Sequence, residues 1–448
     1  MKATYDFFDF EVNNKMFDIK DKKGFIVWES IRYFAFCKLV RQWGSMSQHT
    51  DEKTKVLTIF IAIKNLFQFF IYLIRHRNSD TMFFLCSRDK KNNLLYDKIL
   101  GSIFDEANKK KSFAIESHDS FGQSNYKYKG QTCSTILLTI LFKLFRNKKY
   151  NSEIDKILSA NYQDKDINFS EMRDAYGLFY SQYYFYRFLF RFCKIRKLFL
   201  VQNGIQKGMF ASAKECGVKV LELQHGQVSD NHPAYSYPKE MVEFPEKIYA
   251  PDIFLTFGNF WMKNSVFPGV KIEPLGNDFY AQSGSINSIE NVEKKILVIS
   301  SYIHGEVLSQ CVKEISEKDS SFSFYFKLHP NEFEDIEKYQ RFFAANDKIR
   351  IVTNEATVTE LLGKTEFVLL IQSTAELEAL RNGKKVIILR KLDYEALDFV
   401  FREKGIFFID NAADFLNCYK AHKDELIEPR TDIFQPFDKD KALNLLKC

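Results

Sequence analysis

The chain has 448 residues, of which 46% are apolar and 27% are charged, so a disordered chain is excluded and two or three globular domains are expected. Phe is abundant at 46 residues, whereas Gly (18) and Pro (9) are scarce, which excludes collagen-like and Pro-rich segments. The net charge of +6 is too small to indicate nucleic-acid binding by itself, and we expect no nucleic-acid partner.

Three features of the sequence indicate the cellular compartment. The N-terminal segment lacks the basic start and apolar core of a signal peptide. The stretch Val56–Ile74 is long enough to span a bilayer, but Lys64, Asn65 and Gln68 interrupt its centre, so we interpret it as an amphipathic helix. The eight cysteines are scattered without CxxC spacing, as in reduced cytoplasmic proteins.

The N-terminal part alternates long helical patterns with short apolar runs. We predict strands at Met82–Cys86, Phe113–Glu116, Leu198–Gln202, Val218–Leu223, Ile253–Thr256 and Ile272–Leu275. We predict helices at Glu29–Trp43, Lys53–His76, Thr135–Arg146 and Arg173–Ile195. The polar stretch Ala281–Glu293 lacks apolar periodicity and is typical of a linker, so we place the domain boundary near residue 285.

The C-terminal part, 286–448, alternates short apolar strands with helices. We predict strands at Lys295–Ser300, Phe322–Leu328, Ile349–Thr353, Phe367–Ile371, Val386–Leu389 and Ile406–Ile409, and a helix at Tyr394–Lys404. This alternation indicates a parallel sheet covered on both faces. The predicted fold class is therefore α/β, GT-B-like, with two Rossmann-like domains facing a central cleft. We expect the last helix to pack back on the N-terminal domain.

The loops after the C-terminal strands carry hydroxyls, histidines and amides at the edge where ligands of parallel sheets gather. An imidazole, a hydroxyl or a helix start can each donate hydrogen bonds to a phosphate. The candidate binding residues are Ser301, His304, Gly305, His329, Pro330, Asn331, Ser373, Thr374 and Glu378. Plain helix capping by Ser373 and Thr374 remains an alternative, as does a dipole role rather than ribose binding by either Glu376 or Glu378.

One strand-end loop of the N-terminal domain is rich in groups for proton transfer. Two histidines and one aspartate lie within eight residues, and a glycine there permits a tight turn or a close backbone approach. The candidate catalytic residues are His225, Asp230 and His232, and the candidate acceptor-loop residues are Glu222, Gln224 and Gly226. No HxH or HExxH spacing supports a metal site, so we predict none.

Two aromatic segments, Phe179–Leu200 and Leu141–Tyr150, are rich in Lys and Arg and contain no acid. Such helices can rest on anionic lipid head groups, which suggests peripheral contact with a membrane. They could also bind a polyanionic glycan or nucleic acid. The alternative is a core helix whose basic side chains extend to the surface.

Several of these motifs together resemble GT-B glycosyltransferases of bacterial capsule and O-antigen polysaccharide biosynthesis. They are Gln224-His225-Gly226, Pro251-Asp252, Leu275-Gly276-Asn277, His329-Pro330 and Gln372-Ser373-Thr374. The His-Pro and Ser-Thr pairs are similar to those of bacterial sialyltransferases, capsule Kdo transferases and CDP-glycerol glycerophosphotransferases. The resemblance implies that His329, Ser373 and Thr374 contact the phosphate of a cytidine nucleotide donor, and that His225 serves the acceptor side.

The expectation from this resemblance is a metal-independent glycosyltransferase without a cofactor. It would move a sugar from a nucleotide-sugar donor, with CMP-sugars favoured and UDP- or GDP-sugars as alternatives, to a surface-polysaccharide or lipid-linked glycan. We expect it in the cytoplasm, with peripheral contact at the inner face of the bacterial plasma membrane. A CDP-glycerol-type phosphotransferase, a nucleotide-sugar epimerase and a non-catalytic glycan-binding protein remain alternatives.

Overall fold

A computed structural model of the chain gives its fold. It describes residues 2–40, 55–91, 93–116, 125–163, 165, 167–201, 204–226, 228, 232–262, 266–282, 294–301, 304–344, 346–371, 373–390, 400 and 403–447. The chain forms two compact units. Unit 1 comprises Met1–Phe257, Trp261–Leu275 and Phe437–Cys448, and unit 2 comprises Gly258–Phe260 and Gly276–Pro436.

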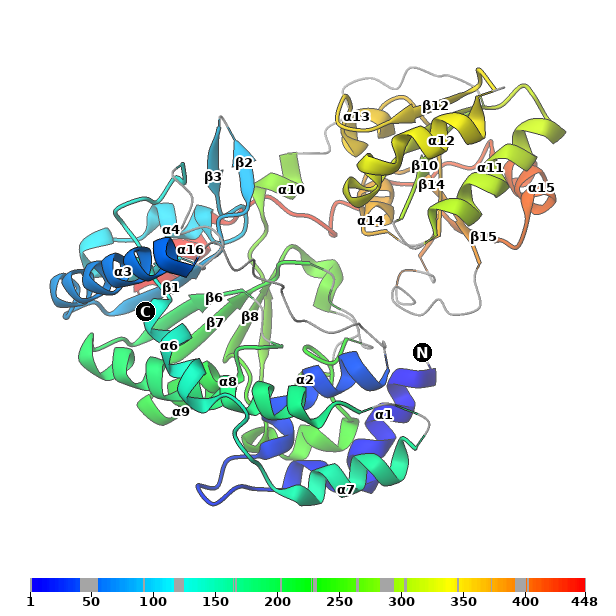
Figure 1. Cartoon of the computed structure of the whole chain (residues 1–448). Helices are drawn as coiled ribbons and strands as arrows, with labels where there is room; N and C mark the ends of the chain where they lie inside the picture. Colours follow the sequence, from blue (N-terminus) through cyan, green and yellow to red (C-terminus); the bar gives the residue numbers. More distant parts are fainter. Residues whose placement is uncertain are drawn as a thin grey trace. The chain divides into compact units, whose positions relative to one another are not determined.

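The core of unit 1 is a seven-stranded parallel sheet in the order β5-β4-β1-β6-β7-β8-β9 (Figure 1). Its strands are β1 Thr81–Leu85, β4 Ser112–Glu116, β5 Cys133–Ser134, β6 Lys197–Leu200, β7 Lys219–Leu223, β8 Ile253–Thr256 and β9 Lys271–Pro274. All six strands expected in this part are present within a residue or two. The short β5 and the antiparallel hairpin of β2 (Asp89–Lys91) and β3 (Leu94–Tyr96) were not predicted.

Helices cover both faces of this sheet. They are α1 Lys2–Asn13, α2 Val27–Leu39, α3 Lys55–Arg75, α4 Gly101–Glu106, α6 Ile136–Phe145, α7 Ser152–Asn161, α8 Phe169–Phe192 and α9 Lys207–Cys216. Phe104 on α4 packs against Phe83, whereas Tyr72 on α3 packs against Phe113, the register partner of Met82. Because neighbouring residues of a strand point to opposite faces, α3 and α4 cover opposite faces of the sheet.

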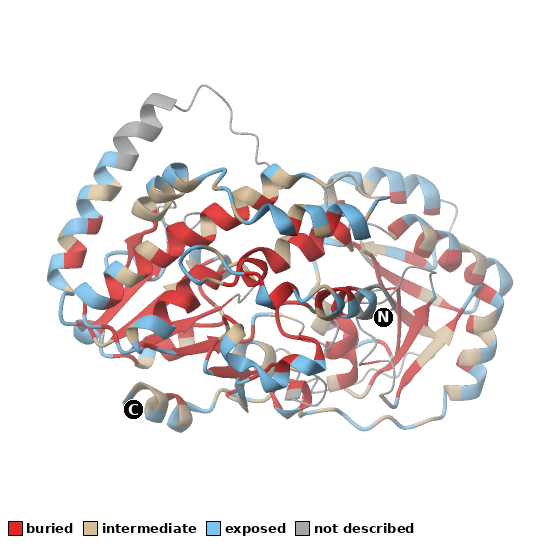
Figure 2. Cartoon of the chain, turned by 90° about the horizontal axis from the view of Figure 1, so that it is seen from below, coloured by how far each residue is buried: buried red, intermediate tan, exposed pale blue. Residues whose placement is uncertain are grey.

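Helix α8 belongs to the core of unit 1. Thirteen of its 24 residues are buried, and the buried positions run along most of its length (Figure 2). Its Arg187 and Arg191 both pair with Glu215 on α9, at 2.7 and 2.9 Å. The structure therefore supports the core-helix alternative for this basic aromatic segment, since an acid of the same unit offsets two of its charges.

Unit 2 contains a six-stranded parallel sheet in the order β12-β11-β10-β13-β14-β15. Its strands are β10 Lys295–Ile299, β11 Ser323–Lys327, β12 Ile349–Val352, β13 Phe367–Leu370, β14 Lys385–Leu389 and β15 Ile406–Ile409. Its helices include α11 Gly305–Lys318, α12 Ile336–Phe343, α13 Val358–Leu362, α14 Ala375–Arg381 and α15 Ala412–His422. The α/β class with two Rossmann-like units is confirmed, because both sheets are parallel and helix-covered.

The chain returns to unit 1 at its end, where α16 (Lys439–Lys447) contacts α4. Gly276 is needed before this return, because its φ is +76° and an added Cβ would lie 1.9 Å from the carbonyl oxygen of Pro436. The boundary predicted near residue 285 and most of the helix predicted at Tyr394–Lys404 lie outside the described residues.

Candidate functional site

In unit 2 the candidate residues surround the switch point of the sheet. The sheet order corresponds to 3-2-1-4-5-6, so the chain leaves β10 toward β11 and later returns to β13 on the other side of β10. Ligands of doubly wound sheets bind where the carboxyl ends of two such strands diverge. Ser301, His304 and Gly305 follow β10, and Ser373 and Thr374 follow β13, so the structure brings these five candidates to one edge.

A buried carboxylate holds this edge together. Glu332 accepts hydrogen bonds from Ser300 Oγ at 3.0 Å, from the backbone N–H of His329 at 2.9 Å and from the hydroxyl of Tyr339. It therefore connects the end of β10, the loop after β11 and helix α12. Gly305 lies against the same carboxylate, since an added Cβ would be 2.2 Å from Glu332 Oε1.

The tautomer of His329 follows from its role at a helix start. Its Nδ1 accepts the backbone N–H of Asn331 at 3.2 Å, and Pro330 occupies the first position of the 3₁₀ helix Pro330–Asp335. In the neutral ring the proton must therefore be on Nε2. His329 is exposed, so Nε2–H is a donor that can reach an external phosphate.

The start of α14 combines a half-buried and an exposed hydroxyl with a buried acid. Ser373 Oγ accepts the N–H of Ala375 at 3.2 Å, while Thr374 is exposed. Glu376 is fully buried, and among the described residues neither of its carboxylate oxygens has a hydrogen-bond partner. Burial raises the pKa of Glu376 well above its usual value. Glu378, by contrast, is half-buried.

In unit 1 the loop after β7 rests on two buried polar residues. Gln224 donates to the carbonyl of Gly226 at 2.8 Å and accepts the N–H of Phe257 at 2.8 Å, which ties the loop to the end of β8. Glu222, also fully buried, accepts the hydroxyl of Tyr235 at 3.0 Å. Hydrogen bonds of Gln224 and Glu222 therefore hold the strand-end loop in place.

Glu222 and Tyr235 determine which ring nitrogen of His225 carries the proton. The hydroxyl proton of Tyr235 goes to Glu222, so the Tyr235 oxygen, 3.4 Å from His225 Nδ1, accepts the proton that Nδ1 carries. Nε2 is then left with a free lone pair on a side chain whose surface is open to solvent. Desolvation by surrounding protein atoms and the charge of Arg88 lower the pKa of His225 to about 4, so the ring is neutral at pH 7.

The side chain of His232, in the same loop, is hydrogen-bonded and stacked within the protein. Its Nδ1 accepts the N–H of Ala234 at 3.2 Å, and its ring stacks on Tyr33 with centroids 6.1 Å apart. Below it, the buried Arg32 donates to the carbonyls of Pro233 and Ser236. His232 thus shapes the loop and shares Tyr235 as a neighbour with His225.

The buried Arg32 is itself anchored by an acid. Its guanidinium forms a two-pronged ion pair with Glu11 on α1, with Arg32 Nη2 2.9 Å from Glu11 Oε2. Trp28 Nε1 donates to the same carboxylate at 2.6 Å. Helices α1 and α2 therefore support the strand-end loop of unit 1, which gives the N-terminal residues a place in the candidate site.

Two of the loop residues stay predictions. Asp230 lies outside the described residues. Gly226 does not have a positive φ, and an added Cβ would meet no described heavy atom within 4 Å, so the structure leaves its role as a turn residue or a site of close backbone approach open.

Three residues of the two edges were not predicted: Arg88, Tyr235 and Glu332. Arg88 follows β1, so the strand-end rule that found the other loops could have found it as well. Glu332 follows His329-Pro330 at the third helical position, where a capping acid is common. Nothing in the sequence indicates that Tyr235 reaches back to Glu222 and His225.

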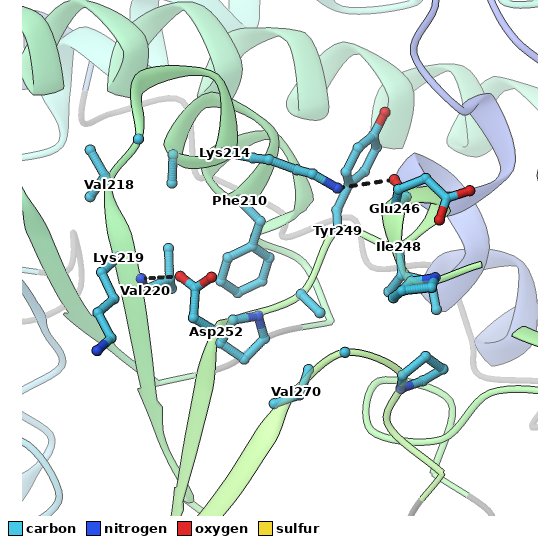
Figure 3. Close-up of a pocket in the computed structure, with 17 residues that line it drawn as sticks. Phe210, Lys214, Val218, Lys219, Val220, Glu246, Ile248, Tyr249, Asp252 and Val270 are labelled. Carbon is cyan, nitrogen blue, oxygen red and sulfur yellow. Dashed lines mark hydrogen bonds between the residues drawn. The ribbon is translucent and has the colours of Figure 1, made fainter. Parts of the chain in front are cut away.

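A separate pocket of about 650 Å³ lies at the other end of the unit 1 sheet (Figure 3). Its lining includes Val218, Asp252 and Val270, which precede or begin the strands β7, β8 and β9. Asp252 accepts the N–H of Val220 at 2.7 Å, and Lys214 donates to the carbonyl of Glu246 at 3.1 Å. This pocket is therefore distinct from the strand-end loops, and the side chains of Asp252 and Lys214 are bonded within its own lining.

Two further findings concern metals and membranes. No group of three or more His, Cys, Asp or Glu side chains that could hold a metal ion occurs within the described part of the chain. No helix among the described residues is long and apolar enough to cross a membrane.

Comparison with known proteins gives similarity at the level of solved structures. No family model and no curated sequence matches the chain. UDP-GlcNAc 2-epimerase from Methanocaldococcus jannaschii is 12% identical, with 82% of this chain and 99% of that chain covered and a TM-score of 0.49. UDP-GlcNAc 2-epimerase from Neisseria meningitidis, bound to UDP-GlcNAc, is 12% identical over 82% and 99%, with a TM-score of 0.45.

MurG from Acinetobacter baumannii is 7% identical, with 82% of this chain and 98% of that chain covered and a TM-score of 0.47. No residue role in this chain follows from these similarities.

Proposed function

We propose that the chain is a glycosyltransferase that moves a sugar from a nucleotide-sugar donor to a glycan acceptor. The observation that carries the proposal is the division of chemistry between the units. Unit 2 has hydrogen-bond donors suited to a phosphate at its switch point, whereas unit 1 has a neutral imidazole whose Nε2 can accept a proton. A two-substrate transfer needs both, because one group must bind the leaving phosphate and another must activate the acceptor.

The reaction can be written with these groups. The acceptor hydroxyl loses its proton to His225 Nε2 while its oxygen forms a bond to the anomeric carbon of the donor sugar. The bond between that carbon and the phosphate oxygen breaks, and its electron pair leaves with the nucleotide. In this proposal His329 Nε2–H and the Ser373 hydroxyl stabilise the departing charge, so no metal is required.

Tyr235 acts as a positioning residue in this scheme. By accepting from His225 Nδ1 while donating to Glu222, it fixes the tautomer that leaves Nε2 unprotonated. The resemblance of the His-Pro and Ser-Thr pairs makes a CMP-sugar the first donor to test, followed by UDP- and GDP-sugars. The proposed acceptor is a surface polysaccharide or a lipid-linked glycan.

The test is product analysis with CMP-, UDP- and GDP-sugars, each with and without a glycan acceptor. Wild type should transfer the sugar, and His225→Ala should reduce transfer by about 10²- to 10⁴-fold while leaving nucleotide affinity intact. His422→Ala is the matched control, since this histidine pairs with Glu425 on the far side of unit 2 from the strand-end loops.

Undiminished transfer by His225→Ala would contradict the proposal. An isomerised nucleotide sugar formed without acceptor would identify an epimerase instead. Transfer of glycerol phosphate from CDP-glycerol would identify the phosphotransferase, and binding of glycan without any turnover would identify a binding protein.

A further inference from the structure

Helix α3 presents a line of large apolar side chains to solvent. Ile63, Phe67, Phe70 and Ile74 are 61%, 68%, 43% and 63% exposed. Their spacing of four, three and four residues places them on one side of the helix. The opposite side of α3 is packed, since Phe69 is fully buried and lies near Phe185 of α8. We call these four residues the apolar ridge.

Exposure of this kind is unusual for a water-facing helix. Isolated apolar side chains are common on protein surfaces, but a continuous line of four large ones marks a site of contact. Figure 2 shows exposed and intermediate residues along the described part of α3.

The neighbouring helix α6 has the same character. Eight of its ten residues are large and apolar, yet none is fully buried, and Leu144 is 73% exposed. Helix α6 contacts both α3 and α8. Two adjoining helices therefore leave apolar surface without a partner in the described chain.

The charged residues of these two helices are all positive. Helices α3 and α6 together contain Lys55, Lys64, Arg75 and Lys143 and no Asp or Glu. Lys64, Arg75 and Lys143 are exposed, and among the described residues no ion pair is found for them. On α8, by contrast, Arg187 and Arg191 are paired with Glu215.

We propose that the apolar ridge of α3, with the adjoining α6, docks on an anionic lipid surface. Apolar side chains can enter the head-group region while flanking Lys and Arg bind lipid phosphates, as in interfacial amphipathic helices. A second copy of the chain fits less well, because a two-fold interface on this surface would bring Lys64 and Arg75 toward the same residues of the other copy. The lipid contact thus lies on α3 rather than on the basic stretch of α8, and it holds whether or not the chain transfers sugar.

The test is co-sedimentation of the full chain with vesicles of phosphatidylcholine, with and without phosphatidylglycerol. Wild type should bind the anionic vesicles, and higher salt should weaken binding. The variant Phe67→Glu/Ile74→Glu should bind at least about tenfold more weakly. The control Val242→Glu/Leu426→Glu makes the same charge change at residues that are 57% and 87% exposed and should bind like wild type.

A second variant, Lys64→Glu/Arg75→Glu, separates charge from apolar contact and should also lose binding to anionic vesicles. Thermal unfolding midpoints near that of wild type will show that the variants fold, and nucleotide affinity should stay unchanged in all of them. Equal vesicle binding by the ridge variant and its control would overturn the proposal, as would no binding of wild type. A dimer that the ridge substitutions dissociate would assign the surface to a second copy instead.

Discussion

Two glycines in the strand-end loops differ in what surrounds them. An alanine at Gly305 would place Cβ 2.2 Å from Glu332 Oε1 and from the Tyr339 hydroxyl, so this buried network must move. We predict that Gly305→Ala lowers the free energy of unfolding by about 1–3 kcal/mol. Gly226→Ala meets open space, so its effect should stay within about 0.5 kcal/mol. Urea unfolding of both variants checks this, and equal losses would contradict it.

The pH dependence of His225 is a second prediction at this scale. Its pKa is lowered from 6.5 to about 4, so between these values the unfolded chain binds a proton that the native ring does not. The stability that this ring contributes is therefore present above pH 6.5 and is lost as pH falls toward 4. We predict that kcat/KM falls on the acid side with a pKa nearer 4 than 6.5.

A nuclear magnetic resonance titration of the His225 ring measures the same quantity directly. Tyr235→Phe should shift the titration, because the ring loses the oxygen that accepts from Nδ1. His422→Ala should leave it unchanged. A His225 ring that titrates near 6.5 in wild type would contradict the account of the neutral base.

Only the residues that directly follow strands in the two candidate sites could be predicted from the sequence. A residue that directly follows an apolar strand, such as His225, Ser301 or His329, can be found from the strand alone, since parallel strands end at one edge. Tyr235 could not be found this way, because its role depends on a hydroxyl that reaches 13 residues back along the chain to Glu222. Such contacts arise from tertiary packing, which local patterns do not encode.

At the scale of elements, α2 and α9 are joined by a buried ion pair. Lys207 Nζ lies 2.8 Å from Glu29 Oε1 and also donates to the Tyr237 hydroxyl at 2.9 Å. Both charged side chains are almost fully buried, and desolvation lowers the pKa of Lys207. We predict that Lys207→Met destabilises the chain by about 3–5 kcal/mol, because the charge of Glu29 is left unpaired.

The exposed Lys219 on β7 offers the matched control, since Lys219→Met should change stability by less than about 0.5 kcal/mol. The double variant Glu29→Gln/Lys207→Met should recover part of the loss, since it removes both charges together. Urea unfolding measures these variants together with the single variant Glu29→Gln. A double variant as unstable as the sum of Glu29→Gln and Lys207→Met would contradict coupling between the helices.

Helix patterns were less informative than strand patterns. The aromatic and basic residues of α8 allowed contact with a lipid surface, binding of a polyanion or a place in the core, and only its burial and its contacts with α9 favour the core. The ridge of α3 lies in a segment whose polar centre was recognised, but which face is packed depends on β4, β5 and α8. Helix α1 was not predicted, and its Glu11 proves to anchor Arg32 beneath the loop of His232.

At the scale of the whole molecule, the C-terminal helix stabilises the N-terminal unit. Lys439 and Lys441 pair with Glu106 and Glu273 at 2.8 and 2.9 Å, and Ala442 is fully buried. We predict that removal of residues 437–448 lowers the unfolding midpoint of unit 1 by several degrees and leaves that of unit 2 unchanged. Differential scanning calorimetry checks this.

Lys439→Ala alone should have little effect, since a single exposed ion pair contributes about 0–1 kcal/mol. A truncated chain with unchanged transitions would show that α16 is dispensable for unit 1.

The architecture of the two sheets was predicted well, because each buried parallel strand is a short apolar run bounded by polar residues. The return of the chain to unit 1 is harder to see in the sequence. It depends on Gly276 and on residues near 436, which are 160 positions apart and meet only in the folded chain.

The central claim is that the strand-end loops of unit 2 bind a nucleotide. Calorimetric titration of the full chain with CMP, CDP, UDP and GDP measures it most directly, with His329→Ala/Ser373→Ala beside wild type. The account predicts that at least one nucleotide binds wild type with one site per chain, and that the double variant binds it at least about tenfold more weakly. Binding of no nucleotide, or equal binding by the double variant, would contradict it.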